Sequence, residues 1–250
     1  MSVDTPEQLE GLKRVGRVVA ETIAAVRSAA VAGITTKELD AVAQAVLDRH
    51  GARSGPILTY RYPAAICLSV DAEIVHGVPG GRRLREGQLL SIDVAAEVDG
   101  FHADAATTIA VGRASASAWR LMAAGRAALR AGIQAAQPGA TLRDIGAAVE
   151  RVTEASGFHV ARELTGHGIG RRMHEPPTVF NWPAPYPEAS RELTEGLVFT
   201  IEPMILAGRP GLVTESDGWT VRSRDGSFST HEEHTVMVRH EGALVLTAAA

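Results

Sequence analysis

Two stretches of this chain share a ten-residue pattern, and each ends in an acidic residue. Residues 84–93 and residues 193–202 both read Leu-x-Glu-Gly, three further residues, then a hydroxyl residue, Ile and an acid. The acids are Asp93 and Glu202, and each closes an apolar run. A carboxylate at the end of an apolar strand is costly to bury unless a positive charge compensates it. The repeat therefore indicates two half-domains whose acids converge, and the natural partner for converging carboxylates is a metal.

A predicted β-hairpin brings a further acid beside Asp93. Residues 99–100 are Asp-Gly, a strong two-residue hairpin turn. If this dipeptide lies at the turn, Asp93 pairs opposite Ala106, and Asp104 lies two residues along on the same face of the sheet. The alternative is a surface hairpin with exposed acids. The apolar run 89–92 argues against that alternative for Asp93 more than for Asp104.

Histidines and one more acid follow in the second half of the chain. His167 lies in Thr-Gly-His-Gly-Ile-Gly, where it has little packing role of its own. A lone histidine is more often structural, but the glycine setting favours metal ligation by a neutral imidazole. His174 follows seven residues later, before a glutamate and two prolines that hold the turn. Glu233 lies in residues 231–235, His-Glu-Glu-His-Thr, which lead into a predicted strand.

These residues form a candidate set of metal ligands: Asp93, Asp104, His167, Glu202 and Glu233. Four carboxylates and one imidazole match the charge of two divalent ions, whereas a lone zinc ion usually has more nitrogen or sulfur ligands. Two ions a few ångströms apart can activate one water molecule and stabilise the oxyanion that it creates. The set therefore points to hydrolysis.

The helices that must position these residues also occur in two copies. Thr35 with Glu38, and Thr141 with Asp144, have the spacing of an N-capping pair, and apolar residues then recur at helical spacing. A longer helix is predicted before each of these. Each half thus consists of two helices followed by strands, and chance is a poor explanation for the same order in both halves.

The predicted architecture is a single catalytic domain over residues 1–250, with half-repeats at about 5–111 and 115–247. No linker rich in Pro, Gly or Ser separates the halves. We expect an α+β fold with pseudo-twofold internal duplication, in which an antiparallel sheet is lined by helices.

Composition restricts the class of protein further. The net charge of −4 gives no nucleic-acid footprint, and 45% hydrophobic residues suit an ordinary globular protein. The single cysteine, Cys67, excludes an intrachain disulfide. The first residues lack the features of a secretory signal, and no apolar stretch is long enough for a membrane helix. We therefore expect a cytoplasmic protein that binds neither nucleic acid nor membrane. A monomer is the expected oligomeric state, although none of these features determines it.

The motifs around these residues resemble those of bacterial type I methionine aminopeptidases. They are residues 74–79, 91–94, 99–104, 166–170, 199–204 and 233–235, and the resemblance runs from about Leu9 to Thr247. It implies the pita-bread fold, an α/β architecture with a dinuclear site between its halves. It also implies a metalloexopeptidase that removes the initiator methionine from nascent polypeptides and prefers a small second residue.

The resemblance assigns roles motif by motif. It implies that the five candidate residues are the ligands of two divalent ions (Co, Mn, Fe or Zn), that Asp104 and Glu233 bridge them, and that Glu202 is the general base or proton shuttle for the attacking water. His76 resembles the residue that helps to bind substrate or passes a proton to the new amine. His174 resembles the residue that stabilises the charge developing on the scissile carbonyl.

The resemblance also implies a pocket for the methionine side chain, formed by Tyr62, Cys67, His76, Met173 and Trp219. An apolar, aromatic slot suits an unbranched thioether. This chain departs from familiar bacterial members at Met173, where Phe is frequent, and at Pro56 and Thr59, where Cys or Tyr is frequent. These departures concern side-chain selectivity rather than the chemistry.

Two other functions are compatible with parts of this pattern. A proline-specific aminopeptidase or prolidase shares the ligand set, but normally carries a large amino-terminal domain, whereas here the catalytic unit starts almost at residue 1. A non-catalytic member that binds RNA or proteins would have lost its metal site, whereas all five ligands and both histidines are present. The expected partners are nascent peptides that start with Met. The ribosome is a further candidate, although no basic extension supports it.

Overall fold

The computed structural model describes residues 1–248, in which helices flank antiparallel strands. The helices are α1 (Pro6–Ala29), α2 (Thr36–Arg49), α3 (Gly55–Tyr60), α4 (Ala116–Ala135), α5 (Leu142–Ala155) and the 3-10 helix η1 (Pro187–Ser190). The strands are β1 (Arg53–Ser54), β2 (Cys67–Val70), β3 (Glu73–Val75), β4 (Leu89–Val98), β5 (Phe101–Ala110), β6 (His159–Val160), β7 (Thr165–Gly168), β8 (Glu175–Phe180), β9 (Val198–Ile201), β10 (Met204–Leu206), β11 (Leu212–Thr214), β12 (Val221–Ser223), β13 (Ser229–His231), β14 (His234–Arg239) and β15 (Gly242–Val245).

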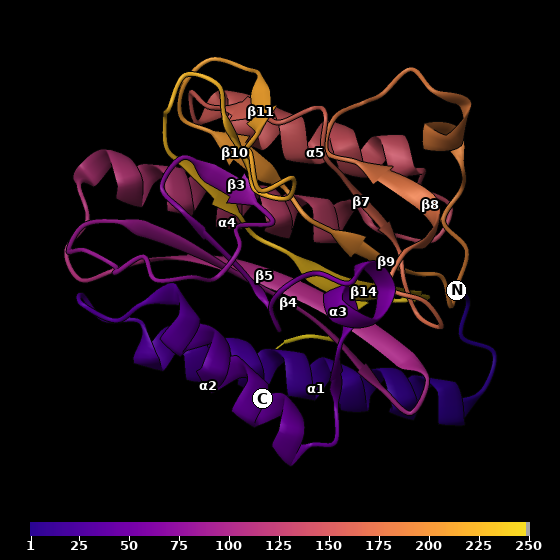
Figure 1. Cartoon of the computed structure of the whole chain (residues 1–250). Helices are drawn as coiled ribbons and strands as arrows, with labels where there is room; N and C mark the ends of the chain where they lie inside the picture. The colour runs from indigo at the N-terminus through magenta and orange to yellow at the C-terminus, as the bar shows by residue number, and fades with distance from the viewer. Residues whose placement is uncertain (249–250) are drawn as a thin grey trace.

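The strands lie between two pairs of helices, with α1 and α2 on one side and α4 and α5 on the other (Figure 1). All strand pairs are antiparallel, as predicted. Hydrogen bonding divides them into four sheets: β1-β4-β2 with β5 on β4, β15-β14-β9-β7-β8, β13-β10-β6 and β11-β12-β3. One division follows Glu202, where Pro203, which has no N–H to donate, separates β9 from β10.

The β4–β5 hairpin has the predicted register. Asp99 and Gly100 form its turn with φ values of 51° and 79°, the left-handed region that such turns require. Asp93 pairs with Ala106. Because side chains alternate along a strand, Ile92 and Val94 face the helices while Asp93 faces the opposite side.

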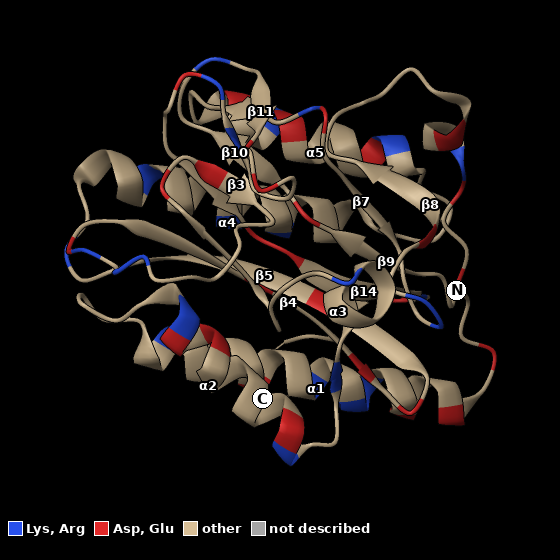
Figure 2. Cartoon of the chain, viewed as in Figure 1, with Lys and Arg blue, Asp and Glu red and all other residues tan. Residues whose placement is uncertain are grey.

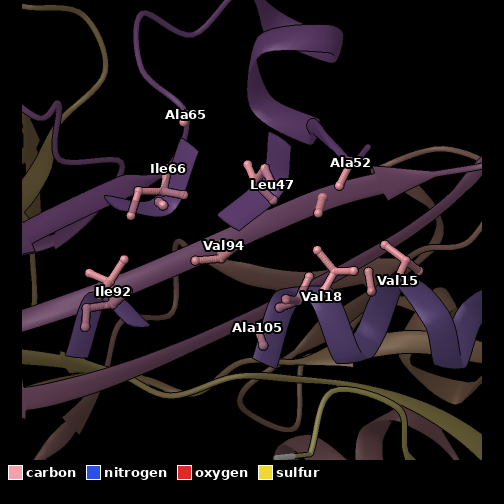
Figure 3. Close-up of a cluster of buried hydrophobic side chains, with 14 of the residues drawn as sticks. Val15, Val18, Leu47, Ala52, Ala65, Ile66, Ile92, Val94 and Ala105 are labelled. Atoms are coloured by element: carbon pink, nitrogen blue, oxygen red, sulfur yellow. The ribbon is translucent and has the colours of Figure 1, made fainter. Parts of the chain in front are cut away.

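The packing of α1 on this hairpin forms the largest part of the core. Val15 and Val18 of α1 lie against the β4–β5 hairpin, near Val94 and Ala105 (Figure 3). These side chains are almost fully buried, so the acid-bearing strands rest on a rigid apolar layer.

The two predicted capping boxes are confirmed. The Thr35 N–H donates to Glu38 Oε2 at 2.7 Å, and the Thr141 N–H donates to Asp144 Oδ2 at 2.7 Å. The returning bonds to both threonine hydroxyls are also present. On these paired elements we propose one domain over residues 1–250, of which 249 and 250 lie outside the described residues, with half-repeats at about 5–111 and 115–247. No helix within residues 1–248 combines the length and the apolar composition needed to cross a membrane.

Gly16 permits close contact between α1 and the carboxyl-terminal segment. A Cβ at this position would lie 2.0 Å from the Leu246 carbonyl oxygen. We expect Gly16→Ala to destabilise the protein by about 1–3 kcal/mol through this overlap, although alanine by itself favours a helix by about 1 kcal/mol. Urea unfolding measures the difference. Ala24→Gly, on the exposed part of α1, is the control and should cost only about 1 kcal/mol. A Gly16→Ala variant of unchanged or higher stability would contradict this packing.

Candidate active site

A cavity of about 300 Å³ is lined by all the residues that the sequence analysis predicted to form the site. Its lining includes Asp93, Asp104, His167, Glu202 and Glu233, together with Tyr62, Cys67, His76, Met173, His174 and Trp219. These side chains come from both halves of the chain. Figure 2 shows acidic segments on the central strands, in addition to the charges spread over the outer helices and loops.

The first-half acids are held by the β4–β5 hairpin. Asp104 is buried on β5, and Asp93 on β4 is partly exposed to the cavity. The Asp104 N–H donates to Thr235 Oγ1 at 2.9 Å, and that hydroxyl donates to the Asp104 carbonyl oxygen at 2.8 Å. Thr235 belongs to β14, so these bonds tie the hairpin to the second half of the chain.

Glu202 and His167 are positioned by the hydroxyl residue of the repeat pattern. Thr200 Oγ1 donates to Glu202 Oε1 at 2.6 Å, and the His167 N–H donates to Thr200 Oγ1 at 3.0 Å. His167 Nδ1 lies 3.0 Å from the Gly168 carbonyl oxygen, which accepts only if Nδ1 carries the proton. His167 Nε2 then keeps its lone pair and lies 3.5 Å from Glu202 Oε1.

Glu233 is buried in the site and connects the second half of the chain to the β4–β5 hairpin. It is only 2% exposed. Its N–H donates to the Ala106 carbonyl oxygen at 2.8 Å. Ala106 is also the residue that pairs with Asp93 across β4 and β5. The ligand atoms of Asp104, His167 and Glu233 all lie within 4.8 Å of one another. Asp93 lies on the same cavity but is outside this group.

Burial shapes the electrostatics of the site. It raises the pKa of Asp93 to about 7 and the pKa of Glu202 to about 8. Burial, reinforced by neighbouring carboxylates, also raises the pKa of Asp104 and of Glu233. Burial lowers the pKa of His167 to about 3, so its ring is neutral. Crowded acids beside a neutral imidazole would be stabilised as carboxylates by a bound cation.

Unpartnered atoms agree with a cation site. Asp104 Oδ1 and Glu233 Oε1 are buried and have no hydrogen-bond partner within residues 1–248. Buried polar atoms without partners are rare in folded proteins, and metal ligation is one way to satisfy them. The donor set therefore fits a metal on its chemistry and on its geometry.

His231 is a site residue that the sequence analysis did not select. Its ring lies on the same cavity, and its ligand atom is within 4.8 Å of those of Glu202 and Glu233. Strand alternation was the available signal, because His231 precedes Glu233 by two residues. Glu232 between them points away, and its Oε2 accepts from the Thr107 hydroxyl at 3.0 Å.

His76 and His174 lie at the exposed part of the cavity. Among the described residues, neither ring belongs to the two groups of possible metal ligands, Asp104 with His167 and Glu233, and Glu202 with His231 and Glu233. His174 stacks near His167 with ring centroids 3.9 Å apart, and Tyr60 Oη lies 2.7 Å from His174 Nδ1. Tyr60, which the sequence analysis also missed, therefore orients His174. Its position two residues before Tyr62 was the only available hint.

An apolar slot adjoins the acids. Tyr62, Cys67 and Trp219 pack in one cluster, and the Tyr62 and Trp219 rings meet edge to face at 5.2 Å. The Tyr62 hydroxyl donates to the Gly77 carbonyl oxygen at 2.8 Å, which leaves the ring face as pocket wall. Cys67 pairs with Asp93 across β2 and β4, so this slot ends beside the acids.

Comparisons with known proteins show the family to which this chain belongs. Residues 10–240 match the profile of metallopeptidase family M24, and the chain belongs to that family. Within the family it is similar to the methionine aminopeptidase of Escherichia coli K12, with 36% identity over 249 residues, 99% of this chain and 94% of that protein. The predicted resemblance is thereby confirmed.

Solved structures support the fold. The crystal structure of methionine aminopeptidase from Rickettsia prowazekii has a TM-score of 0.94 and 33% identity, and the match covers 99% of this chain and all of that chain. The prolidase of Pyrococcus furiosus has a TM-score of 0.78 and 21% identity, and only 66% of its chain is covered. At that identity the likeness shows the fold alone. The predicted α+β pita-bread fold is confirmed.

Proposed function

We propose that this chain is a methionyl aminopeptidase that removes the initiator methionine from polypeptides with a small second residue. One observation carries the proposal: a cluster of four acids and His167 shares its cavity with the apolar slot of Tyr62, Cys67 and Trp219. Similarity to methionine aminopeptidases over 99% of this chain supports the same activity. Nascent chains in the cytoplasm are the proposed substrates, and a monomer is the proposed active form.

We propose that the metal centre holds two divalent ions, Co, Mn, Fe or Zn, on Asp93, Asp104, His167, Glu202 and Glu233. Asp104 and Glu233 are the proposed bridging residues. Bound ions supply positive charge that acidifies water and polarises a carbonyl. Oxygen-rich sites with little nitrogen accept several of these ions, so the donor set leaves the choice open.

The surrounding residues have distinct tasks in this proposal. Glu202, whose Oε1 accepts from the Thr200 hydroxyl at 2.6 Å, would accept the proton of the attacking water. His174, held by Tyr60 Oη at 2.7 Å, donates to the oxygen on which negative charge develops. His76, at the exposed part of the cavity, binds the substrate or passes a proton to the departing amine.

The apolar slot gives the specificity. An unbranched thioether fills an aromatic pocket well and can contact the ring of Tyr62 or Trp219. Met173 is 8% exposed and forms part of the same lining, where it adds a flexible apolar wall. A β-branched or charged first residue would lose these contacts, so methionine is favoured at the amino terminus of the substrate.

The decisive test is release of methionine from short peptides. We expect metal-dependent release from Met-Ala-Ser and little release when the second residue is bulky, as in Met-Leu-Ser. The protein is freed of metal and then loaded with Co²⁺, Mn²⁺, Fe²⁺ or Zn²⁺ in separate reactions, and free methionine is measured by chromatography. Absence of release with every ion would refute the enzyme proposal. Preferential cleavage of an Ala-Pro-Ser peptide would instead favour the prolidase-like alternative.

A further inference from the structure

We propose that His231 is a further protein ligand of the metal centre and binds, through Nε2, the ion that Glu202 and Glu233 also hold. The five ligands carried over by resemblance include one imidazole, whereas this arrangement contains two. The inference rests on the proposed metal site but is independent of the substrate.

The distances favour ligation over hydrogen bonding. His231 Nε2 lies 3.6 Å from Glu233 Oε2 and 3.8 Å from Glu202 Oε2, which is too long for hydrogen bonds. Two ligand atoms that each lie about 2.1 Å from one ion are themselves separated by ~3.0–3.6 Å. The three side chains are therefore close to the separations that a shared ion requires.

Burial leaves the His231 ring in need of a partner. The residue is 2% exposed, and within residues 1–248 neither Nδ1 nor Nε2 has a hydrogen-bond partner. A structural core histidine normally satisfies at least one ring nitrogen, because an unpartnered buried polar group is costly. An ion at Nε2 removes that cost on the side that faces the carboxylates.

The backbone fixes the direction of the ring. His231 is the last residue of β13, where it pairs with Met204 of β10, and its N–H donates to Thr108 Oγ1 at 2.9 Å. The next side chain, Glu232, points toward Arg126, whose Nη1 lies 3.9 Å from Glu232 Oε1. His231 and Glu233 thus face the cavity while Glu232 faces away from it.

The two ligand groups then each contain one imidazole. His167 groups with Asp104 and Glu233, and His231 groups with Glu202 and Glu233. A second nitrogen donor favours Co²⁺, Fe²⁺ and Zn²⁺ over Mn²⁺. We expect His231→Gln to weaken the binding of one of two Co²⁺ ions at least about tenfold, with a smaller change for Mn²⁺.

Proton NMR of the Co²⁺-loaded protein tests this directly. A histidine that binds Co²⁺ through one nitrogen gives a strongly shifted resonance from the N–H on the other, and the signal disappears in D₂O. We expect two such resonances in the wild-type protein, one from His167 and one from His231. His231→Gln should remove one of them, while His174→Gln, which changes a histidine on the same cavity, should retain both.

The outcomes separate this inference from the proposed function. One resonance in the wild-type protein, lost in His167→Gln, would overturn ligation by His231 and leave the proposed metal site intact. Failure to bind Co²⁺ at all would overturn both. Because the wild-type spectrum alone counts the imidazole ligands, the result does not depend on whether His231→Gln folds, which circular dichroism checks separately.

Discussion

Glu233→Gln should remove metal from the site and reduce methionine release by about 10³-fold or more, because a metal ion contributes several kcal/mol to a hydrolytic transition state. Glu233 is the residue common to both candidate ligand groups of the described chain. It is also the proposed bridge between the ions. A neutral amide in its place removes the charge that both ions share, in a position that is only 2% exposed and cannot recruit bulk water.

The neighbouring glutamate provides a matched control. Glu232 has the same side chain and is 4% exposed, but it lies against Thr107 and Arg126 instead of the cavity. Glu232→Gln should therefore keep its metal and release methionine at close to the wild-type rate. Metal per chain, measured by elemental analysis, and release from Met-Ala-Ser are determined for both variants. Two bound ions in Glu233→Gln, or equal metal loss in both variants, would contradict the assignment.

His76→Asn should slow turnover by about 10²–10⁴-fold, the range for removing a general acid or base, without loss of metal. His76 lies on the cavity but in neither ligand group of the described residues. Its φ of 58° is in the left-handed region, which asparagine tolerates better than alanine, so Asn removes the imidazole with little added backbone strain. Comparing Asn with Ala separates the loss of the ring from the strain.

An exposed histidine away from the cavity, His50, provides the control for His76. His50 is exposed and pairs with Glu21 at 2.7 Å, in a part of the molecule that does not line the cavity. His50→Ala should leave both turnover and metal content unchanged. If His76→Asn loses metal in parallel with activity, His76 is a metal ligand and not a substrate contact.

Local rules were sufficient for much of the fold. The Asp-Gly turn fixes the register of β4 and β5, and a side-chain period of two then places Asp93 and Asp104 on one face. The capping boxes at Thr35 and Thr141 depend on residues only three positions apart. Such features depend on neighbours in the sequence, so they are readable without knowledge of the tertiary structure.

Long-range contacts decided the details of the site. His231 meets Glu202 because β13 pairs with β10, and Glu233 meets the hairpin because its N–H bonds the Ala106 carbonyl oxygen across a separation that no local pattern encodes. Among the described residues, Asp93 lies outside both ligand groups, and Tyr60 meets His174 across a separation of 114 residues.

The sequence by itself determined which side chains can hold a metal and which strand faces they occupy, because chemistry and side-chain alternation are local properties. Only the tertiary structure decided which of them lie close enough together to hold one ion. That choice depends on how two strand systems from opposite halves of the chain approach each other. The two acids that end the repeated pattern show the difference: both line one cavity, but Glu202 groups with His231 and Glu233, whereas Asp93 lies beside Cys67 at the end of the apolar slot.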